Sequence, residues 1–267
     1  MNRVAINIGS LSITWYSICI LSGIILAYIL ISKEAKKFNI TSSFVSNLVF
    51  WCVIFGILGA RIYYVLFNLD YYANDPIEAI KIWNGGLAIH GGIIAGLITL
   101  IVHCKKYNVN ILKMLDISVP YVMLAQGIGR WGNFFNSEAH GGIVTKAYLK
   151  AHHIPNFIIN GMHIGNHYYH PTFLYESILC LLGFLVLVFI RRRKFAKNSN
   201  IISLYLIWYG VIRFFIESLR TDSLMLGSLK MAQVISIIMI IIGIVMLIIT
   251  SMKSKYYNED KITLKKS

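Results

Sequence analysis

The amino-acid sequence predicts an all-α fold: a polytopic integral membrane protein with about seven transmembrane helices. Of its 267 residues, 57% are hydrophobic and only 13% are charged, whereas about a quarter of the residues of a soluble domain are charged. A helix needs about 20 mostly apolar residues to cross a bilayer, and the chain has seven runs near that length. Runs this long indicate helices rather than barrel strands, because each must satisfy its own backbone hydrogen bonds in lipid.

The predicted spans form one integral membrane domain over residues 1–267. We expect no cleaved signal peptide, since the first run is too long for one and no Ala-x-Ala site follows it. Residues 132–171, between the fourth and fifth spans, are expected to form an extracytoplasmic loop or small cap. The spans are expected at residues 13–32, 45–67, 86–104, 115–131, 172–190, 201–219 and 231–252.

The basic residues are unevenly distributed between the two ends of the predicted spans. Sixteen of the 25 Lys and Arg residues lie in residues 33–41, 105–114, 191–200 and after residue 252. In a seven-span chain these segments share one side, so the positive-inside rule predicts an N-terminus outside and a cytoplasmic C-terminus. This distribution explains the net charge of +14 through topology, and we expect no nucleic acid as a partner.

Polar residues gather at the outer end of every predicted span, although successive spans run in opposite directions. Ionisable side chains at membrane depth are costly and mark functional sites. The pattern therefore predicts one polar cavity in the outer-leaflet half of the helix bundle. Its candidate residues are Tyr16, Arg61, His90, Arg130, Asn133, Asn136, Glu138, Glu176, Tyr209, Arg213, Glu217 and Arg220.

The composition of this expected cavity favours an anionic ligand. Tyr209, Arg213 and Glu217 are spaced by four residues, which places them on one helix face. Four arginines and three glutamates leave about one surplus positive charge. A guanidinium matches pairs of phosphate oxygens, and phospholipids are the phosphate compounds most available at this depth.

Neither a metal nor another cofactor is expected. The cysteines Cys19, Cys52, Cys104 and Cys180 lie in apolar runs without paired spacing, and the histidines of residues 140–170 match no zinc signature. An alcohol phosphatidyltransferase would need clustered aspartates to hold divalent metal, but the five aspartates are scattered. The remaining alternative is a non-catalytic transporter or scramblase of anionic phospholipid, which would need polar residues in the cytoplasmic half, where the spans are mostly apolar.

The stretch "GRWGNFFNSEAHG" at residues 129–141 resembles the signature of the bacterial prolipoprotein diacylglyceryl transferases. That signature reads Gly-Arg-x-Gly-Asn-Phe-x-Asn-x-Glu-x-x-Gly, and all its specified positions match, up to Gly141. Further similar stretches include "WNGGLAIHGG" at 83–92, "HPTFLYE" at 170–176 and "YGVIRFFIESLR" at 209–220. The resemblance covers nearly the whole chain, while Ala60, Ser17 and Ala232 stand where the family usually has Gly.

The resemblance implies an enzyme of the bacterial cytoplasmic (inner) membrane with its active site toward the outer, periplasmic leaflet. It would transfer the diacylglyceryl group of phosphatidylglycerol to the lipobox cysteine thiol of a preprolipoprotein, forming a thioether and releasing glycerol 1-phosphate. The partners implied are phosphatidylglycerol, signal peptides with a lipobox cysteine, and membrane lipid. No cofactor is implied, and the substrate supplies the thiol.

Specific roles can be assigned to the candidate residues on this basis. Arg130 and Arg213 are expected to bind the phosphate, and His90 to accept or relay the thiol proton. We expect the signature to form a phosphate-binding turn. The other expected substrate-binding residues are Asn133, Asn136, Glu138, Gly141, Tyr16, Arg61, Tyr209, Glu217, Glu176 and Arg220.

Overall fold

The computed structural model describes residues 3–253 and 257, except for residues 10 and 228. The chain divides into two compact units: unit 1 contains Met1–Leu30 and Leu115–Asp260, and unit 2 contains Ile31–Met114. Among the described residues, seven helices are long and apolar enough to cross a membrane. The predicted polytopic, all-α class is confirmed, while the predicted single domain and the orientation of the termini stay predictions.

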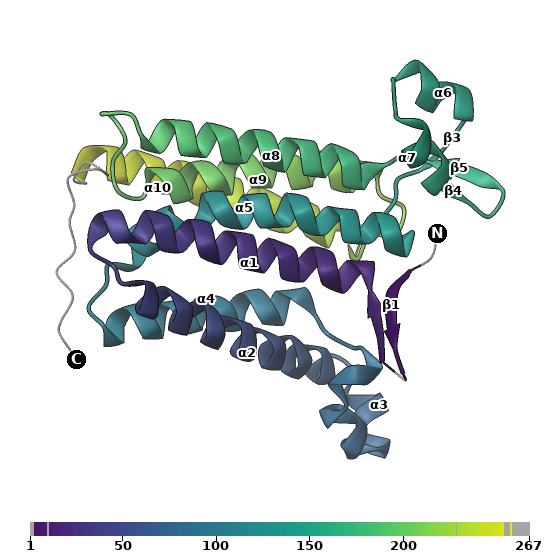
Figure 1. Cartoon of the computed structure of the whole chain (residues 1–267), viewed down its shortest axis with the longest axis horizontal. Helices are drawn as coiled ribbons and strands as arrows, with labels where there is room; N and C mark the ends of the chain where they lie inside the picture. Colours follow the sequence, from purple (N-terminus) through teal and green to yellow (C-terminus); the bar gives the residue numbers. More distant parts are fainter. Residues whose placement is uncertain (1–2, 10, 228, 254–256, 258–267) are drawn as a thin grey trace. The chain divides into compact units, whose positions relative to one another are not determined.

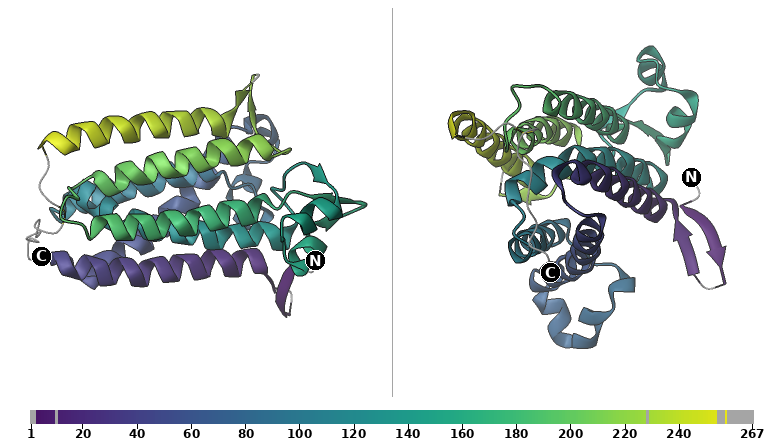
Figure 2. Two further views of the ribbon diagram at one scale, coloured as in Figure 1. Left: turned by 90° about the horizontal axis from the view of Figure 1, so that it is seen from above. Right: turned by 60° about the vertical axis from the view of Figure 1, so that its left-hand side comes forward.

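Unit 1 is built around α5 (Ile111–Asn136), which contacts three neighbouring helices. Gly23 of α1 (Trp15–Ala35) packs against Ala125, and Gly127 packs against Cys180 of α8 (Thr172–Arg191). Gln126 meets Tyr205 of α9 (Asn200–Leu219), which in turn packs against α10 (Met231–Lys253). Figures 1 and 2 show these helices running alongside one another. Small residues on α5 allow this close approach.

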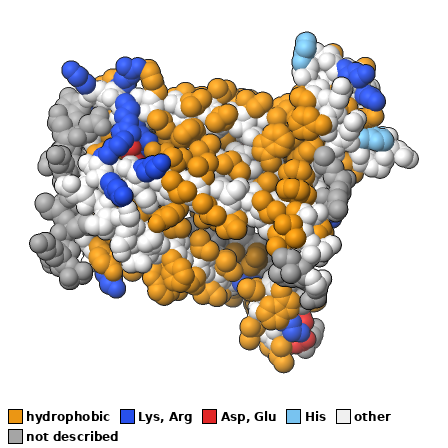
Figure 3. Space-filling view, in the orientation of Figure 1, with side chains coloured by type: hydrophobic (Ala, Val, Ile, Leu, Met, Phe, Trp, Pro, Cys, Tyr) orange, Lys and Arg blue, Asp and Glu red, His pale blue; other side chains and the backbone are white. Residues whose placement is uncertain are grey.

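The surface of unit 1 suits a lipid environment. Leu21, Phe189 and Ile241 have exposed fractions of 58%, 58% and 54%. Figure 3 shows hydrophobic side chains over most of the visible face of the helices, with basic side chains gathered where α8 ends. Apolar surface this extensive is rare on a soluble monomer. We conclude that the long helices of unit 1 face lipid.

A small subdomain connects α5 to α8 within unit 1 (Figure 1). It contains a three-stranded antiparallel sheet in the order β3-β5-β4 and two short helices. Phe134, Ile158 and Phe173 form a buried cluster that fastens it to the helices. Its elements are β3 (Ile143–Val144), α6 (Lys146–Ala151), α7 (Asn156–Gly161), β4 (His163–Ile164) and β5 (His167–Tyr169).

Two hairpins complete unit 1. The first pairs β1 (Val4–Ile8) with β2 (Leu11–Thr14) directly before α1. The second pairs β6 (Met225–Leu226) with β7 (Leu229–Lys230) between α9 and α10. Its turn includes Gly227 at a φ of 62°, a conformation that glycine adopts without steric cost.

Unit 2 is a helical pair, α2 (Ser42–Leu66) and α4 (Ile89–Lys106), with a compact segment between them. Gly59 and Gly91 face each other, and a Cβ on Gly91 would collide with the Gly59 carbonyl and Tyr63. The two backbones are therefore in direct contact. The remaining elements are η1 (Lys36–Phe38), α3 (Leu69–Asn74), η2 (Pro76–Ile80) and η3 (Ile82–Asn84).

The expected turn at the signature motif is wrong for most of its length. Residues 129–136 form the last two turns of α5, which is longer at both ends than the predicted span. The helix ends where Ser137 and Ala139 adopt left-handed φ angles of 55°, and the Glu138 amide donates to the Asn133 carbonyl at 3.0 Å. Gly129 and Gly132 do not break the helix, because both are packed against α1.

The glycine contact in unit 2 gives a testable prediction. We expect Gly91→Ala to lower the melting temperature of the detergent-purified protein by several degrees, since overpacking costs about 1–3 kcal/mol. Gly96→Ala on the same helix is the matched control, because a Cβ there has no atom within 4 Å. A thermal unfolding curve recorded by intrinsic fluorescence measures both, and equal melting temperatures for the two variants would contradict the packing.

Candidate active site

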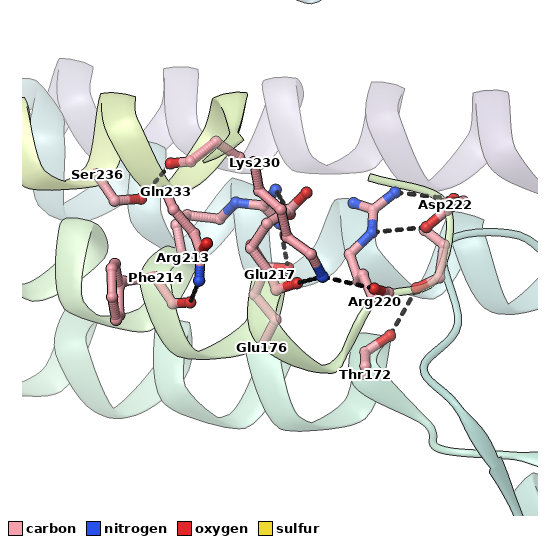
Figure 4. A network of polar contacts seen from close by, with 12 residues as sticks. Thr172, Glu176, Arg213, Phe214, Glu217, Arg220, Asp222, Lys230, Gln233 and Ser236 are labelled. Carbon is pink, nitrogen blue, oxygen red and sulfur yellow. Dashed lines mark hydrogen bonds and ion pairs between the residues drawn. The ribbon is translucent and has the colours of Figure 1, made fainter. Parts of the chain in front are cut away.

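Three helices of unit 1 bring four charged side chains into one continuous chain of ion pairs. Glu176 of α8 accepts from Arg130 of α5 through Oε1 (2.8 Å to Nη2) and from Arg213 of α9 through Oε2 (3.2 Å to Nη1). Arg213 also pairs through Nη2 with Glu217 Oε2 at 2.7 Å. We call these four residues the arginine–glutamate chain. Figure 4 shows Glu176, Arg213 and Glu217 pointing toward one another.

The arginine–glutamate chain is buried and electrically balanced. Glu176 and Glu217 have exposed fractions of 2% and 3%, whereas 20% of the Arg130 side chain and 14% of the Arg213 side chain are exposed. Charges this deep must be paired, because removing one partner of a buried ion pair costs about 3–5 kcal/mol. The arginines are therefore the more accessible members of the four.

Tyrosines extend the polar contacts along α9. The Tyr209 hydroxyl accepts from Arg130 Nη2 at 3.3 Å and donates to Glu176 Oε1 at 3.4 Å. Tyr205, one turn earlier, stacks on Tyr209 with ring centroids 5.9 Å apart, and its hydroxyl accepts from Gln126 Nε2 at 3.0 Å. Sequence reasoning missed Gln126 and Tyr205. Their spacing of four residues from Arg130 and Tyr209 is the signal that could have found them.

The signature residues beyond Arg130 lie around the end of α5. Asn136 Nδ2 donates to Glu138 Oε1 at 3.4 Å, and Glu138 is exposed, while Asn133 is half-buried. Gly141 is in close contact with other backbone: its amide donates to the His170 carbonyl at 3.0 Å. A Cβ at this position would lie 2.7 Å from His170 Cβ, which explains why glycine stands there.

Tyr16 is placed beside the signature by a second close contact. Its ring covers Gly132, where a Cβ would lie 2.7 Å from Tyr16 Cδ2. Next to it, Trp15 stacks on Phe135 with ring centroids 5.2 Å apart. The packing of α1 on α5 therefore brings Tyr16 to the same end of α5 as the signature residues.

Arg220 follows the end of α9 and is neutralised by a residue that the charge count left out. Its Nε and Nη2 each donate to a carboxylate oxygen of Asp222 at 2.9 Å. Partial burial raises the pKa of Asp222, but the hydrogen bond and charge of Arg220 outweigh this and hold it below its usual value. The expected surplus of positive charge is corrected accordingly: Arg220 is balanced by Asp222, and the arginine–glutamate chain is neutral.

Arg61 lies in unit 2 and is surrounded by backbone carbonyls. Its Nε donates to Ala79 O at 2.9 Å, Nη1 to Gly85 O at 2.7 Å and Gly86 O at 3.0 Å, and Nη2 to Glu78 O at 2.5 Å. These bonds hold the segment between α2 and α4 together. Arg61 also borders a cavity of about 270 Å³ that includes Tyr64, Asn68, Tyr71 and Tyr72.

His90 lies in unit 2 as well, in the first turn of α4. It is half-buried, and its ring centroid lies 6.2 Å from that of Tyr63. Just before it, the amide of Ala88 donates to the carbonyl of Ala60 at 3.0 Å, which fixes the start of α4 against α2. The structure thus groups the unit 1 candidates together, whereas Arg61 and His90 belong to unit 2.

Within the described part of the chain, no three His, Cys, Asp or Glu side chains are arranged to hold a metal ion. The site itself consists of two arginines held by one buried carboxylate. Such an arrangement binds and stabilises anions, since guanidinium donors in a dry setting act strongly on developing negative charge.

Comparison with known proteins identifies the family. The family described as "Prolipoprotein diacylglyceryl transferase" matches residues 3–249. Relatives named "Phosphatidylglycerol--prolipoprotein diacylglyceryl transferase" include those of Staphylococcus saprophyticus, 48% identical over 95% of this chain and 91% of the relative, and Staphylococcus haemolyticus, 50% identical over 95% and 89%. That of Staphylococcus aureus strain Newman is 49% identical over 95% and 90%. The chain therefore belongs to the prolipoprotein diacylglyceryl transferase family.

Proposed function

We propose that this protein is a transferase that moves the diacylglyceryl group of phosphatidylglycerol to a prolipoprotein, the first step of lipoprotein maturation. The observation that carries the proposal is the similarity over 95% of the chain to relatives named for this activity. The acceptor is the thiol of the lipobox cysteine, and the products are a thioether-linked lipoprotein and glycerol 1-phosphate.

The reaction is a displacement at the glycerol carbon that carries the phosphate ester. The cysteine thiolate forms the new carbon–sulfur bond, the carbon–oxygen bond to phosphate breaks, and glycerol phosphate leaves with the bonding electron pair. The thiol proton goes to a base, and thiolate rather than thiol is the nucleophile. The protein must therefore stabilise the departing phosphate and help to remove one proton.

Arg130 and Arg213 are the residues we assign to the departing phosphate. A guanidinium has five N–H donors, and among the described residues the contacts of Arg130 use Nη2 alone. Its Nε and Nη1 donors are available to a ligand. Because Glu176 holds both guanidinium groups before substrate arrives, little reorganisation is needed as charge develops on the phosphate.

The remaining candidates are proposed to complete substrate binding. Glu176 and Glu217 orient the arginines, and Tyr209 supports Arg130. His90 is proposed as the group that accepts or relays the thiol proton, since imidazole commonly serves as a general base. The other proposed substrate-binding residues are Tyr16, Arg61, Asn133, Asn136, Glu138, Gly141 and Arg220.

We further propose that the site works in the bacterial cytoplasmic (inner) membrane and opens toward its outer leaflet. The support is the excess of basic residues at the opposite ends of the spans. In that orientation the arginines of α5 and α9 lie at the depth of phospholipid headgroups, where both phosphatidylglycerol and the signal peptide of a prolipoprotein are present.

The phosphate assignment predicts the effect of removing either arginine. We expect Arg130→Ala and Arg213→Ala each to lower glycerol phosphate release by about 100-fold or more, since losing one charge-stabilising donor costs about 10²–10³ in rate. The assay uses purified protein, phosphatidylglycerol and a synthetic lipobox peptide. Arg193→Ala is the control and should retain activity, because Arg193 lies in the connection between α8 and α9. Near-normal turnover in both site variants would exclude the assignment of Arg130 and Arg213 to the departing phosphate.

Glu176→Gln tests whether the carboxylate that bridges both arginines is needed for their charge balance. The substitution preserves shape but leaves two buried cations underpaired, so we expect a lower melting temperature, with a cost on the order of 3 kcal/mol. Added phosphatidylglycerol should stabilise the variant more than the wild type, because its phosphate replaces the missing charge. The exposed Glu138→Gln should change stability by less than about 0.5 kcal/mol. Equal stabilisation of wild type and Glu176→Gln by the lipid would argue against this charge balance.

The proton-transfer role of His90 is tested by a pH profile. A base accepts a proton only in its unprotonated form, so a base at this position gives activity that rises with pH. We expect His90→Gln to lower the rate and to remove this rise, measured as thioether formation from pH 5 to 9. A variant with wild-type rate and an unchanged profile would remove His90 from the mechanism.

A further inference from the structure

Lys230 closes the C-terminal end of α9, although it lies ten residues beyond Arg220. Its Nζ donates to the backbone oxygens of Glu217 at 2.7 Å and Arg220 at 2.8 Å. Figure 4 shows its side chain reaching between these two residues. Carbonyls at a helix end lack partners within the helix, and a lysine ammonium both satisfies them and suits the negative end of the helix dipole.

The hairpin between α9 and α10 fixes the place from which Lys230 reaches back. Lys230 pairs with Met225 across the two strands, and the amide of Met231 donates to the Leu224 carbonyl at 2.8 Å. The backbone at Lys230 is therefore held by hydrogen bonds of its own. Its side chain joins the end of one long helix to the start of the next.

Gln233 provides a second, weaker fastening of the same segment. Its Nε2 donates to Ser218 Oγ at 3.0 Å and to the Phe214 carbonyl at 3.4 Å. Together the two residues hold residues 214–220 of the chain from the α10 side. Within that segment lies Glu217, whose carboxylate pairs with Arg213 at 2.7 Å.

We propose that Lys230 is a positioning residue for the arginine–glutamate chain, an inference that rests on the proposed transferase function. Lys230 bonds the backbone of the same residue, Glu217, whose side chain orients Arg213. It also bonds the backbone of Arg220, which forms a β-bridge with Gly141 of the signature. One ammonium group thus fixes the turn that carries the Arg213 partner and the strand contact to the signature.

A positioning role for Lys230 and a purely stabilising role predict different effects of its removal. If Lys230 only stabilised the fold, its loss would lower the folded fraction but leave the turnover of each folded molecule unchanged. If it positions Glu217, its loss acts through Arg213 and reduces turnover in molecules that remain folded. Small displacements of catalytic groups are known to cost up to about 100-fold in rate.

The test compares Lys230→Met, Lys230→Gln and Lys230→Arg, with exposed Lys150→Met as the control for loss of a lysine. Active monodisperse protein is assayed for kcat and KM with phosphatidylglycerol and a lipobox peptide. We expect Lys230→Met to lower kcat/KM by about 10- to 100-fold, Lys230→Gln to be intermediate, and Lys230→Arg to recover most of the activity. Lys150→Met should match the wild type.

Two further measurements separate positioning from a general loss of stability. In a double-mutant cycle, the effect of Lys230→Met should shrink in a Glu217→Gln background, because contacting residues are not additive. Hydrogen exchange at residues 214–220 should accelerate in Lys230→Met, whether or not the protein is a transferase. An inactive wild type would refute the proposed function, whereas an active wild type with unchanged kcat/KM in Lys230→Met, or strictly additive effects, would overturn the positioning role.

Discussion

The cost of burying charge in an apolar helix bundle determines the arrangement of unit 1. Glu176 is almost completely buried, and it stabilises the site only because both of its oxygens accept from guanidinium groups of two other helices. Neither arginine could lie this deep without such a partner. The carboxylate therefore joins α5, α8 and α9, and the position of the site follows from the need to pair these charges.

A binding site built this way is rigid but still open to a ligand. Both carboxylate oxygens of Glu176 are already engaged by the protein, whereas Arg130 keeps donors beyond Nη2 within the described structure. An incoming phosphate can add to the guanidinium without first breaking the bridge to Glu176. Because the arginine–glutamate chain is neutral, the protein without lipid also avoids the large free-energy penalty of burying an uncompensated charge. In the proposed function, the substrate brings its negative charge to the two arginines, the more accessible members of the four.

Much of this organisation follows from the sequence. The remainder depends on contacts between different helices, which the spacing of residues within one helix does not reveal. The number of spans follows from the apolar runs, although α5 extends beyond its run at both ends. The spacing of Arg213 and Glu217 by four residues predicts their contact. Spacing gives a helix face but not the residue opposite it, so the bridging position of Glu176 and the pairing of Gln126 with Tyr205 could not be derived. The helical signature was expected as a turn because glycines close to a neighbouring helix resemble glycines in a loop. Lys230 was not among the candidate residues.

Arg61 and Arg130 show why residue type and depth do not suffice to assign a role. Both arginines lie near the same predicted end of their spans, yet their donors meet different groups. The Arg61 guanidinium donates along every edge to carbonyls of residues 78–86, and these neutral groups occupy its donors. Arg130 instead shares a carboxylate and retains donors, so an anion can bind it directly. The distinguishing property is which donors are occupied: backbone carbonyls occupy those of Arg61, whereas within the described structure Arg130 uses only Nη2. Charge-assisted hydrogen bonds to an anion are strong and directional, which is why Arg130 rather than Arg61 is proposed to bind the leaving phosphate.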